Sequence, residues 1–294
     1  MGQDQHFGGE WTAEKLERVK KYLQAYVRIM SNYNFKFYYI DAFAGTGYVE
    51  LKDRKEDKIN PLLFDLAEEE PQRFIQGSAQ VALQIEPSFS KYVLIEKSSK
   101  RCSELEKLRN SHSHLADRLV IINQEANEVI QEICWRTNWR GTRAVLFLDP
   151  YGMQVRWETI EAIAQTKAID LWLLFPLGVA VNRMLKNDGK INELWAQKLD
   201  SIFGSRDWYN EFYKTNVNIG LFGDIISTEK VATIKDIGDY FVDRLRTIFT
   251  GVAKNPLPLY NSKNNPLFLL CFAAGNAKGA PTAIKIAQDI LRKR

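Results

Sequence analysis

The sequence is poor in cysteine, and its few cysteines are not arranged as a disulfide framework or a metal site. The 294 residues include three, namely Cys102, Cys134 and Cys271. They are odd in number, far apart and never in a C-x-x-C pair, so the sequence predicts neither disulfides nor a bound metal. This usage is typical of a reducing cytoplasm, which is the location that we expect.

Long apolar runs are also missing. No stretch approaches the 18 or so apolar residues that a transmembrane helix needs. The N-terminal residues MGQDQHFGGEW lack the apolar core of a secretory signal. We therefore expect neither export nor contact with a membrane.

A large excess of one charge is missing as well. Forty basic and thirty-six acidic side chains give a formal charge of +4, which neither indicates nor excludes binding to nucleic acid. With 45% hydrophobic and 26% charged residues, the composition is that of an ordinary folded protein. The length suits one large domain with an insertion, or two small domains.

The sequence does contain an apolar run followed by a glycine turn, in KFYYIDAFAGTGYVE from Lys36 to Glu50. The aromatic and β-branched residues before Asp41 predict a strand buried on both faces, and glycines directly after a strand let backbone approach a ligand closely. A Walker phosphate loop is excluded, because no Lys-Ser or Lys-Thr pair follows Gly45 and Gly47 at the required spacing. A dinucleotide fingerprint is disfavoured, because Glu50 stands in place of its third glycine.

The remaining pattern, D-x-F-x-G-x-G, resembles the first motif of class I S-adenosylmethionine-dependent methyltransferases. S-adenosylmethionine carries an ammonium group, a carboxylate and a ribosyl adenine but no phosphate. An acid beside the glycines suits its positive end, and backbone amides suit its carboxylate. The alternative is a buried strand that ends in an ordinary glycine turn. The resemblance makes Asp41 the anchor of the amino-acid end and adds the turn residues to the cofactor site: Ala42, Phe43, Ala44, Gly45 and Gly47.

The chain on either side of this turn alternates helical and extended patterns. After Thr12, the expected N-cap, apolar residues recur at helical spacing up to Met30 and predict a helix. The lysines between these apolar residues predict a solvated face. Residues 48–76 have mixed charge and predict a loop insertion. A crossover helix is predicted to begin at Gly77-Ser78.

Two further strand ends add acids to the cofactor site. Glu96 follows the predicted strand 92–95, where an acid can accept hydrogen bonds from both ribose hydroxyls, and we include its neighbour Lys97. A third strand over residues 118–122 precedes Asn123 and Glu125. Either can accept a hydrogen bond from the adenine amino group, and we favour Glu125.

The second strong motif is TRAVLFLDPYG, which begins at Thr142. It predicts a fourth buried strand with Asp149, Pro150 and Tyr151 at its carboxyl end, where ligands meet open parallel sheets. The motif resembles the [DNS]-P-P-[YFW] of methyltransferases that act on exocyclic amino groups. There the acid or amide and a proline carbonyl accept from the target amine while the ring stacks on the base.

One residue departs from that pattern, because Tyr151 stands where the second proline should be. The short form is similar to the motif of tRNA guanine-26 N2-dimethyltransferases. An ordinary Asp-Pro turn is the alternative. The resemblance makes Asp149, Pro150 and Tyr151 the catalytic residues and adds Asp149 to the cofactor contacts.

The resemblance implies an α/β, doubly wound Rossmann-like methyltransferase fold, with a mostly parallel seven-stranded sheet, an antiparallel last strand and a helical insertion. Residues 1–178 and 255–294 form the methyltransferase-like domain. Residues 179–254 are rich in basic and aromatic side chains and form a helical insertion for substrate or partner recognition. The later elements expected in the domain are a helix over 157–166 and strands over 168–178, 257–260 and 266–274.

Taken in order, six motifs resemble the three-Cys-motif partner protein family, from about residue 6 to residue 290. The family name refers to cysteines in a neighbouring partner protein. The resemblance implies a methyltransferase-like fold and a bacterial two-gene context, but it supplies no substrate. The motifs are Trp11-Thr12-x-x-Lys15-Leu16, YIDAFAGTG, Gly77-Ser78-Ala79, Ile95-Glu96-Lys97, Leu148-Asp149-Pro150-Tyr151-Gly152 and Leu174-Phe175-Pro176-Leu177-Gly178.

The expected function is therefore transfer of a methyl group from S-adenosylmethionine to an exocyclic amino group, with a nucleic acid, RNA rather than DNA, as the favoured substrate. The expected contacts to that nucleic acid are Arg183, Lys186 and Lys190. A small-molecule amine or a protein side chain stays open as the substrate. The alternative function is a catalytically silent module that binds S-adenosylmethionine and acts as the partner of a three-cysteine-motif protein encoded nearby.

Overall fold

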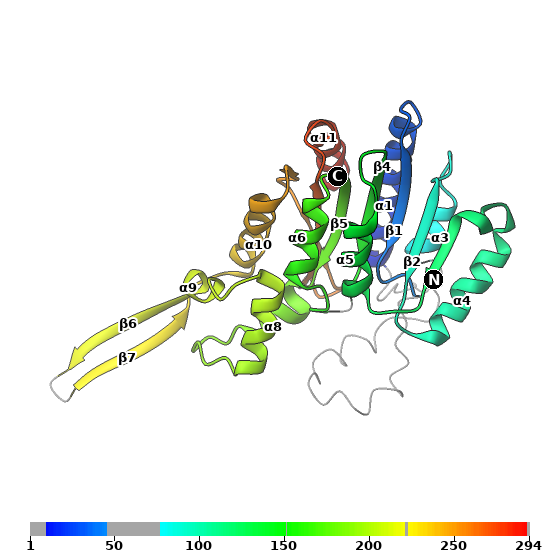
Figure 1. The fold of residues 1–294 in the computed structure, drawn as a ribbon. Helices are drawn as coiled ribbons and strands as arrows, with labels where there is room; N and C mark the ends of the chain where they lie inside the picture. Colours follow the sequence, from blue (N-terminus) through cyan, green and yellow to red (C-terminus); the bar gives the residue numbers. More distant parts are fainter. Residues whose placement is uncertain (1–9, 46–76, 151, 221–222, 293–294) are drawn as a thin grey trace, which may run out of the picture.

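A mostly parallel sheet with helices on both faces forms the body of the protein (Figure 1). The computed structural model describes residues 10–45, 77–150, 152–220 and 223–292. The strand order is β3-β2-β1-β4-β5-β10, and β10 is antiparallel to β5. These strands are β3 (Leu119–Ile122), β2 (Lys91–Ile95), β1 (Lys36–Asp41), β4 (Thr142–Leu148), β5 (Ile169–Phe175) and β10 (Pro266–Ala274).

The far edge of the sheet is one interrupted strand. Both β8 (Gly251–Val252) and β9 (Leu257–Tyr260) pair with β10, β8 at Ala273 and Ala274 and β9 over residues 266–270. Eight strands therefore fill seven positions, with the antiparallel strand last but one in space. This arrangement confirms the predicted doubly wound methyltransferase fold.

The two faces of the sheet bury separate cores, because successive side chains of a strand point to opposite faces. On one face, residues such as Leu146 and Leu148 pack with α5 (Ala126–Arg136), α6 (Trp157–Gln165) and α10 (Ile234–Ile248). On the other face, residues such as Val145 and Phe147 pack with the remaining helices of the body. These are α1 (Glu10–Met30), α3 (Ser78–Leu83) and α11 (Ala280–Leu291), with α4 (Ser99–Ser111) and the 3-10 helix η2 (Ser113–Arg118) beside them.

Most predicted elements are confirmed, and the differences have local causes. The crossover helix does begin at Ser78, with Gly77 as its N-cap. The first helix already includes Glu10, so the prediction of Thr12 as its N-cap is wrong. The fifth strand ends at Phe175, three residues earlier than predicted, because Pro176 leaves the extended conformation and a π-helical turn, η3 (Leu177–Val181), follows. The predicted loop insertion at residues 48–76 lies outside the described residues.

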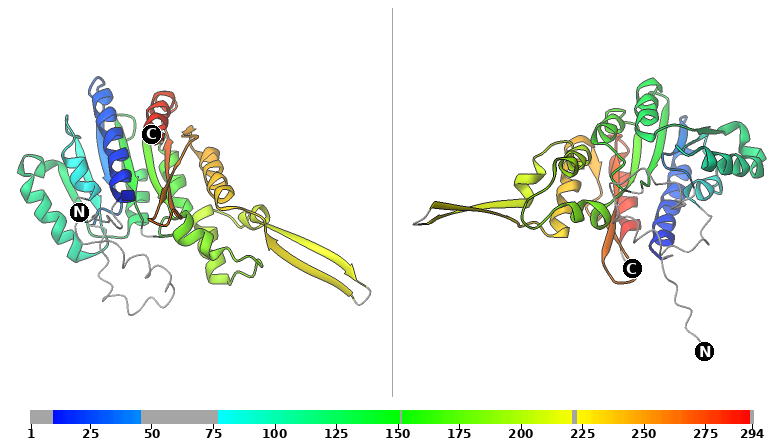
Figure 2. Two further views of the ribbon diagram at one scale, coloured as in Figure 1. Left: turned by 180° about the vertical axis from the view of Figure 1, so that it is seen from behind. Right: turned by 90° about the horizontal axis from the view of Figure 1, so that it is seen from below.

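The segment 179–254 departs from the prediction of a helical insertion. It does contain α7 (Asn182–Met184), α8 (Glu193–Phe203), α9 (Trp208–Phe212) and α10. It also contains an antiparallel hairpin of β6 (Tyr213–Gly220) and β7 (Gly223–Lys230), which Figures 1 and 2 show as an arm projecting from the body.

The boundary of the insertion also moves. In α10, Ile237, Phe241 and Leu245 are fully buried, and the Phe241 ring stacks on Phe175 of β5 at a centroid distance of 3.9 Å. β8 joins the central sheet. Both elements therefore belong to the body of the protein, so the insertion ends before α10 rather than at residue 254.

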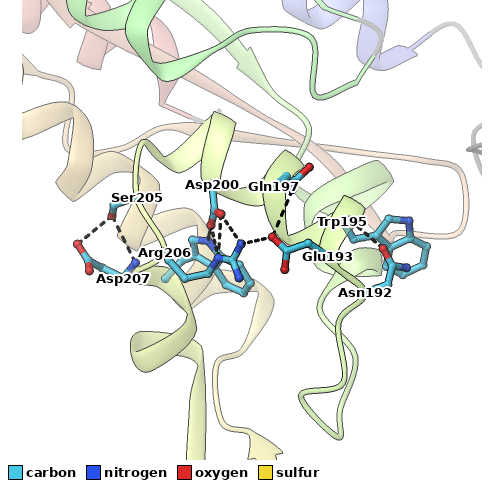
Figure 3. A network of polar contacts seen from close by, with 9 residues as sticks. Asn192, Glu193, Trp195, Gln197, Asp200, Ser205, Arg206 and Asp207 are labelled. Carbon is cyan, nitrogen blue, oxygen red and sulfur yellow. Dashed lines mark hydrogen bonds and ion pairs between the residues drawn. The ribbon is translucent and has the colours of Figure 1, made fainter.

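A polar network joins α8 to α9 at the base of the arm (Figure 3). The Arg206 guanidinium contacts Asp200 at 2.6 Å and Glu193 at 3.1 Å, and the indole of Trp208 donates to Asp200 at 2.8 Å. The arm is also attached to the loop before α8, where Lys230 N donates to the Asn187 carbonyl. The base of the hairpin is thus fixed to the body, whereas Val217, further along β6, is 56% exposed.

Candidate active site

Three acids follow neighbouring strands at one edge of the sheet. Asp41 ends β1, and the parallel register places it beside Leu94 of β2 and Phe147 of β4. Glu96 and Asp149 follow those two strands directly. The carboxyl ends of β1, β2 and β4 therefore bring the three predicted acids to the edge where open parallel sheets bind ligands.

Asp41 is a completely buried carboxylate. It accepts hydrogen bonds from the Tyr39 hydroxyl at 3.0 Å and from Phe43 N at 3.4 Å, and the Ser78 side chain gives another. Burial raises the pKa of Asp41 to about 6. The nearby charge of Asp149 also raises this pKa, whereas the three hydrogen bonds lower it. Among the described residues no lysine, arginine or histidine forms an ion pair with Asp41.

Glu96 closes over the glycine turn. Its Oε2 accepts from Gly45 N at 3.2 Å, its Oε1 accepts from Ser98 N at 2.8 Å, and Arg101 lies 3.6 Å away. A Cβ on Gly45 would stand 2.2 Å from that Oε2, so any larger residue at this position would displace the Glu96 carboxylate. Because a carboxylate has about four acceptor positions, Glu96 keeps room for further donors.

The backbone amides of the glycine turn are already engaged within the protein. Ala42 N donates to the Phe147 carbonyl and Ala44 N to the Ile95 carbonyl, each at 3.1 Å, while Phe43 N and Gly45 N donate to the two acids described above. These four amides therefore have acceptors within the protein, and the role of Ala42, Phe43, Ala44 and Gly45 toward a cofactor stays a prediction. Gly47 lies outside the described residues.

Lys15 of α1 is a site residue that the sequence pattern assigned to a solvated face. Its side chain is buried, and its Nζ lies 2.6 Å from Asp149 Oδ2. The ammonium also lies 5.1 Å from the centre of the Trp11 ring, which stacks on Phe268 at 5.0 Å. The prediction for Lys15 is thus wrong, although the W-T-x-x-K-L motif was a signal that could have singled it out.

Asp149 has one oxygen held by Lys15, and no hydrogen bond to its Oδ1 is formed by the described residues. Pro150 is buried next to it. Tyr151, the third predicted catalytic residue, lies outside the described residues. The strand end therefore presents one carboxylate oxygen with acceptor capacity.

Glu125 serves as the N-cap of α5. It accepts from Glu128 N at 3.1 Å and from the Asn127 side chain at 2.7 Å, with Arg156 3.5 Å away. Burial acts to raise the pKa of Glu125, but the hydrogen bonds and the Arg156 charge outweigh it and lower that pKa. The role of Glu125 toward an adenine amino group stays a prediction.

Asn123, the alternative adenine contact, connects β3 to the end of β2. Its Nδ2 donates to the carbonyl oxygens of Glu96 and Lys97 at 3.0 and 2.9 Å, and its Oδ1 accepts from the Ser99 hydroxyl at 2.8 Å. Asn123 thereby fixes the backbone that carries Glu96. The Lys97 side chain is exposed, and its role as a cofactor contact stays a prediction.

Strand order, helical layers and acid-bearing strand ends place this chain in the class of Rossmann-like methyltransferase folds. No protein-family model matches the chain, and no curated protein does. Membership of the three-Cys-motif partner family is therefore not shown. No described helix is long and apolar enough to span a membrane, and the described residues hold no cluster of three metal-ligating side chains.

The solved structures that are similar to the chain include the following three, all of low sequence identity to it. A Legionella pneumophila protein of family model DUF519 is 16% identical, with a TM-score of 0.47 and 96% of this chain and 91% of that chain covered. A putative S-adenosylmethionine-dependent methyltransferase from Listeria monocytogenes is 11% identical, with a TM-score of 0.35 and coverages of 86% and 97%. Magnesium protoporphyrin IX methyltransferase from Synechocystis, with bound SAM, is 11% identical, with a TM-score of 0.34 and coverages of 79% and 86%. Because these scores lie below 0.5, we take no functional assignment from them.

Proposed function

We propose that this chain is an S-adenosylmethionine-dependent methyltransferase that acts on an exocyclic amino group. The observation that carries the proposal is Asp41, which is completely buried at the glycine turn and has no cationic partner among the described residues. A buried carboxylate without a cation is costly. A ligand that brings an ammonium group to this strand end supplies the missing charge.

The residues at the edge fit the proposed cofactor in kind. Asp41 would hold the ammonium group, and Glu96, with acceptor positions to spare, would hold the ribose hydroxyls. The close contact between Gly45 and the Glu96 carboxylate keeps backbone and acid together where the ribose would lie. When bound, S-adenosylmethionine supplies an electrophilic methyl group.

Asp149 is suited to orient the amino group that receives the methyl group. Its Oδ1 has acceptor capacity, and the Lys15 ammonium holds its Oδ2 in place at 2.6 Å. An ionised carboxylate accepts strongly from an amine N–H. Pro150 continues the motif, and Tyr151 completes the proposed catalytic set.

Calorimetry tests whether the chain binds S-adenosylmethionine, on which the proposal depends. S-adenosylmethionine should bind the full chain, and Asp41→Ala and Glu96→Ala should each weaken binding by roughly 1.5–3 kcal/mol, as expected for lost charge-assisted hydrogen bonds. Lys107→Ala, on the exposed side of α4, is the matched control. Absence of binding down to about millimolar affinity, near −4 kcal/mol, would refute the proposal.

The proposed substrate is a nucleic acid, with RNA favoured. Support comes from the planar amine that the Asp149 motif suits and from the exposed Arg183, Lys186 and Lys190 beside η3 and α8. Binding of bulk tRNA should weaken steeply with salt, because phosphate contacts release counterions. A flat salt dependence would leave a small amine or a protein side chain as the substrate.

The second candidate is a silent module that binds the cofactor and a three-cysteine-motif protein without transferring a methyl group. Two observations favour it: Lys15 occupies Asp149, and the amides of the turn are engaged internally. Co-purification with the product of a neighbouring gene would support it. Methylated nucleosides in cells that express the chain, absent with Asp149→Ala, would exclude it.

A further inference from the structure

Two loops form a basic and aromatic surface at the end of the sheet where the parallel strands begin, opposite the end that carries the three acids. Residues 28–36, RIMSNYNFK, lead from α1 into β1, and residues 135–143, WRTNWRGTR, lead from α5 into β4. Together they contain five lysines and arginines and no acid. The two loops adjoin, because Lys36 N donates to the Gly141 carbonyl at 3.0 Å, and Figure 1 shows both at the top of the sheet. We call this surface the amino-edge patch.

The patch exposes large rings on a fixed base. Trp135 is 92% exposed and Tyr33 is 60% exposed, although tryptophan is on average a highly buried residue. The Tyr33 ring lies 6.4 Å from the Phe35 ring, the Arg143 guanidinium lies 4.3 Å from the centre of the Phe35 ring, and Arg143 donates to the Trp139 carbonyl at 2.8 Å. Neither exposed ring contributes to the two cores, so folding does not explain their presence.

The positive charge of the patch is largely uncompensated. Arg28, Lys36 and Arg140 are exposed, and within the described part of the chain none of them forms an ion pair. Arg136 is paired with Glu132 of α5 at 3.0 Å. The adjoining loop before β2 adds Glu86. Asp170, whose charge interacts with that of Arg143, is a third acid. Even with these three acids counted, the five cations outnumber the acids.

We propose that the amino-edge patch binds single-stranded nucleic acid. Exposed rings offer stacking surfaces to bases, and the guanidinium and ammonium groups offer contacts to phosphates. An acidic peptide would use the charges but leave the rings without a stacking partner, which is why nucleic acid is favoured.

The patch is separate from the proposed active site. The six residues of β1 span about 20 Å at 3.3 Å per residue, so the nucleotide at the patch is not the one that reacts at Asp149. Under the proposed function, it belongs to a flanking part of a long substrate. Binding at the patch needs no cofactor and stands or falls independently of the proposed methyl transfer.

The test uses the full chain without cofactor and two fluorescent probes, a 12-nucleotide oligoadenylate and an abasic strand of the same length. Both should bind at low salt. Trp135→Ala should weaken binding of the oligoadenylate about tenfold, a typical loss for one stacked base, and leave the abasic strand unchanged. Arg140→Glu should weaken both. Leu194→Ala, which removes another exposed apolar side chain, and Lys107→Glu, which makes the same charge change on α4, are matched controls that should change neither.

Three results would overturn the proposal. The first is wild-type affinity of Trp135→Ala and Arg140→Glu for the oligoadenylate, with circular dichroism showing both variants folded. The second is binding of poly-glutamate as tight as that of the oligoadenylate, which identifies an acidic protein partner. The third is complete loss of oligoadenylate binding in an Arg183→Glu, Lys186→Glu, Lys190→Glu variant, which places the nucleic acid on the insertion instead.

Discussion

Lys15 Nζ lies 2.6 Å from Asp149 Oδ2, joining the first helix to the end of the fourth strand across 134 residues of sequence. The Lys15 side chain is 6% exposed and that of Asp149 is 22% exposed. Since one partner is buried, the pair is harder to break than a surface ion pair. It also determines how the proposed catalytic carboxylate is oriented.

Replacing Lys15 should destabilise the protein. We expect Lys15→Met to lower the free energy of unfolding by about 1–3 kcal/mol, because Asp149 is left partly buried and unpaired. Lys21→Met is the control, since Lys21 pairs with Glu17 on the surface and should cost below about 1 kcal/mol. Urea denaturation measures both. Equal effects of the two variants would contradict a stabilising role of the Lys15 pair.

The buried Asp41 predicts a pH-dependent stability. Its pKa in the folded protein is about 6, above the ordinary 3.8, so the folded state binds more protons between these two values and its stability falls as pH rises through that window. Asp41→Asn should therefore unfold at a higher temperature than wild type at pH 8 and at a similar temperature at pH 4. A wild-type profile for Asp41→Asn would contradict this.

Gly45 and Gly77 form a matched pair. A Cβ at Gly45 meets Glu96 Oε2 at 2.2 Å, whereas no atom of the described residues lies within 4 Å of a Cβ at Gly77. Gly45→Ala should displace Glu96 and weaken cofactor binding at least tenfold, about 1.4 kcal/mol, while Gly77→Ala should bind as wild type does. Calorimetry separates the two, and unchanged binding by Gly45→Ala would show that the contact with Glu96 is dispensable.

Two tyrosines on α1 allow a further comparison. The Tyr22 hydroxyl donates to partly buried Asp170 at 2.7 Å, whereas the Tyr26 hydroxyl is buried with no partner among the described residues. Tyr22→Phe should cost about 1–3 kcal/mol, the penalty for an acceptor left unsatisfied away from water, and Tyr26→Phe should cost nothing or stabilise.

The pH dependence of that cost supplies a second readout. Burial raises the pKa of Asp170 to about 7, so its carboxyl is neutral at pH 5 and ionised at pH 8, where it depends most on its donor. Tyr22→Phe should therefore cost more at pH 8 than at pH 5, measured by chemical denaturation. The same cost at both values would show that Asp170 does not titrate in this window.

The sequence by itself determined the strands and the acids that follow them. Buried parallel strands are continuous apolar runs, so β1, β2 and β4 were recognisable from local pattern, and Asp41, Glu96 and Asp149 were placed because a residue after a parallel strand lies at the ligand-binding edge. The glycine at position 45 was equally visible, and the structure adds the physical reason, the Glu96 carboxylate beside it.

Only the tertiary structure decided what those residues contact. The Lys15 pair with Asp149 and the turn amides donating to β2 and β4 join segments far apart in the chain, and helical periodicity gives no information on such contacts. The arm of β6 and β7 escaped prediction because its strands carry mixed polar and apolar residues with no core to impose a period. In this protein, local pattern specified the elements and the positions of the acids. Packing between distant elements decided which residues those acids contact and which of them pair with a cation.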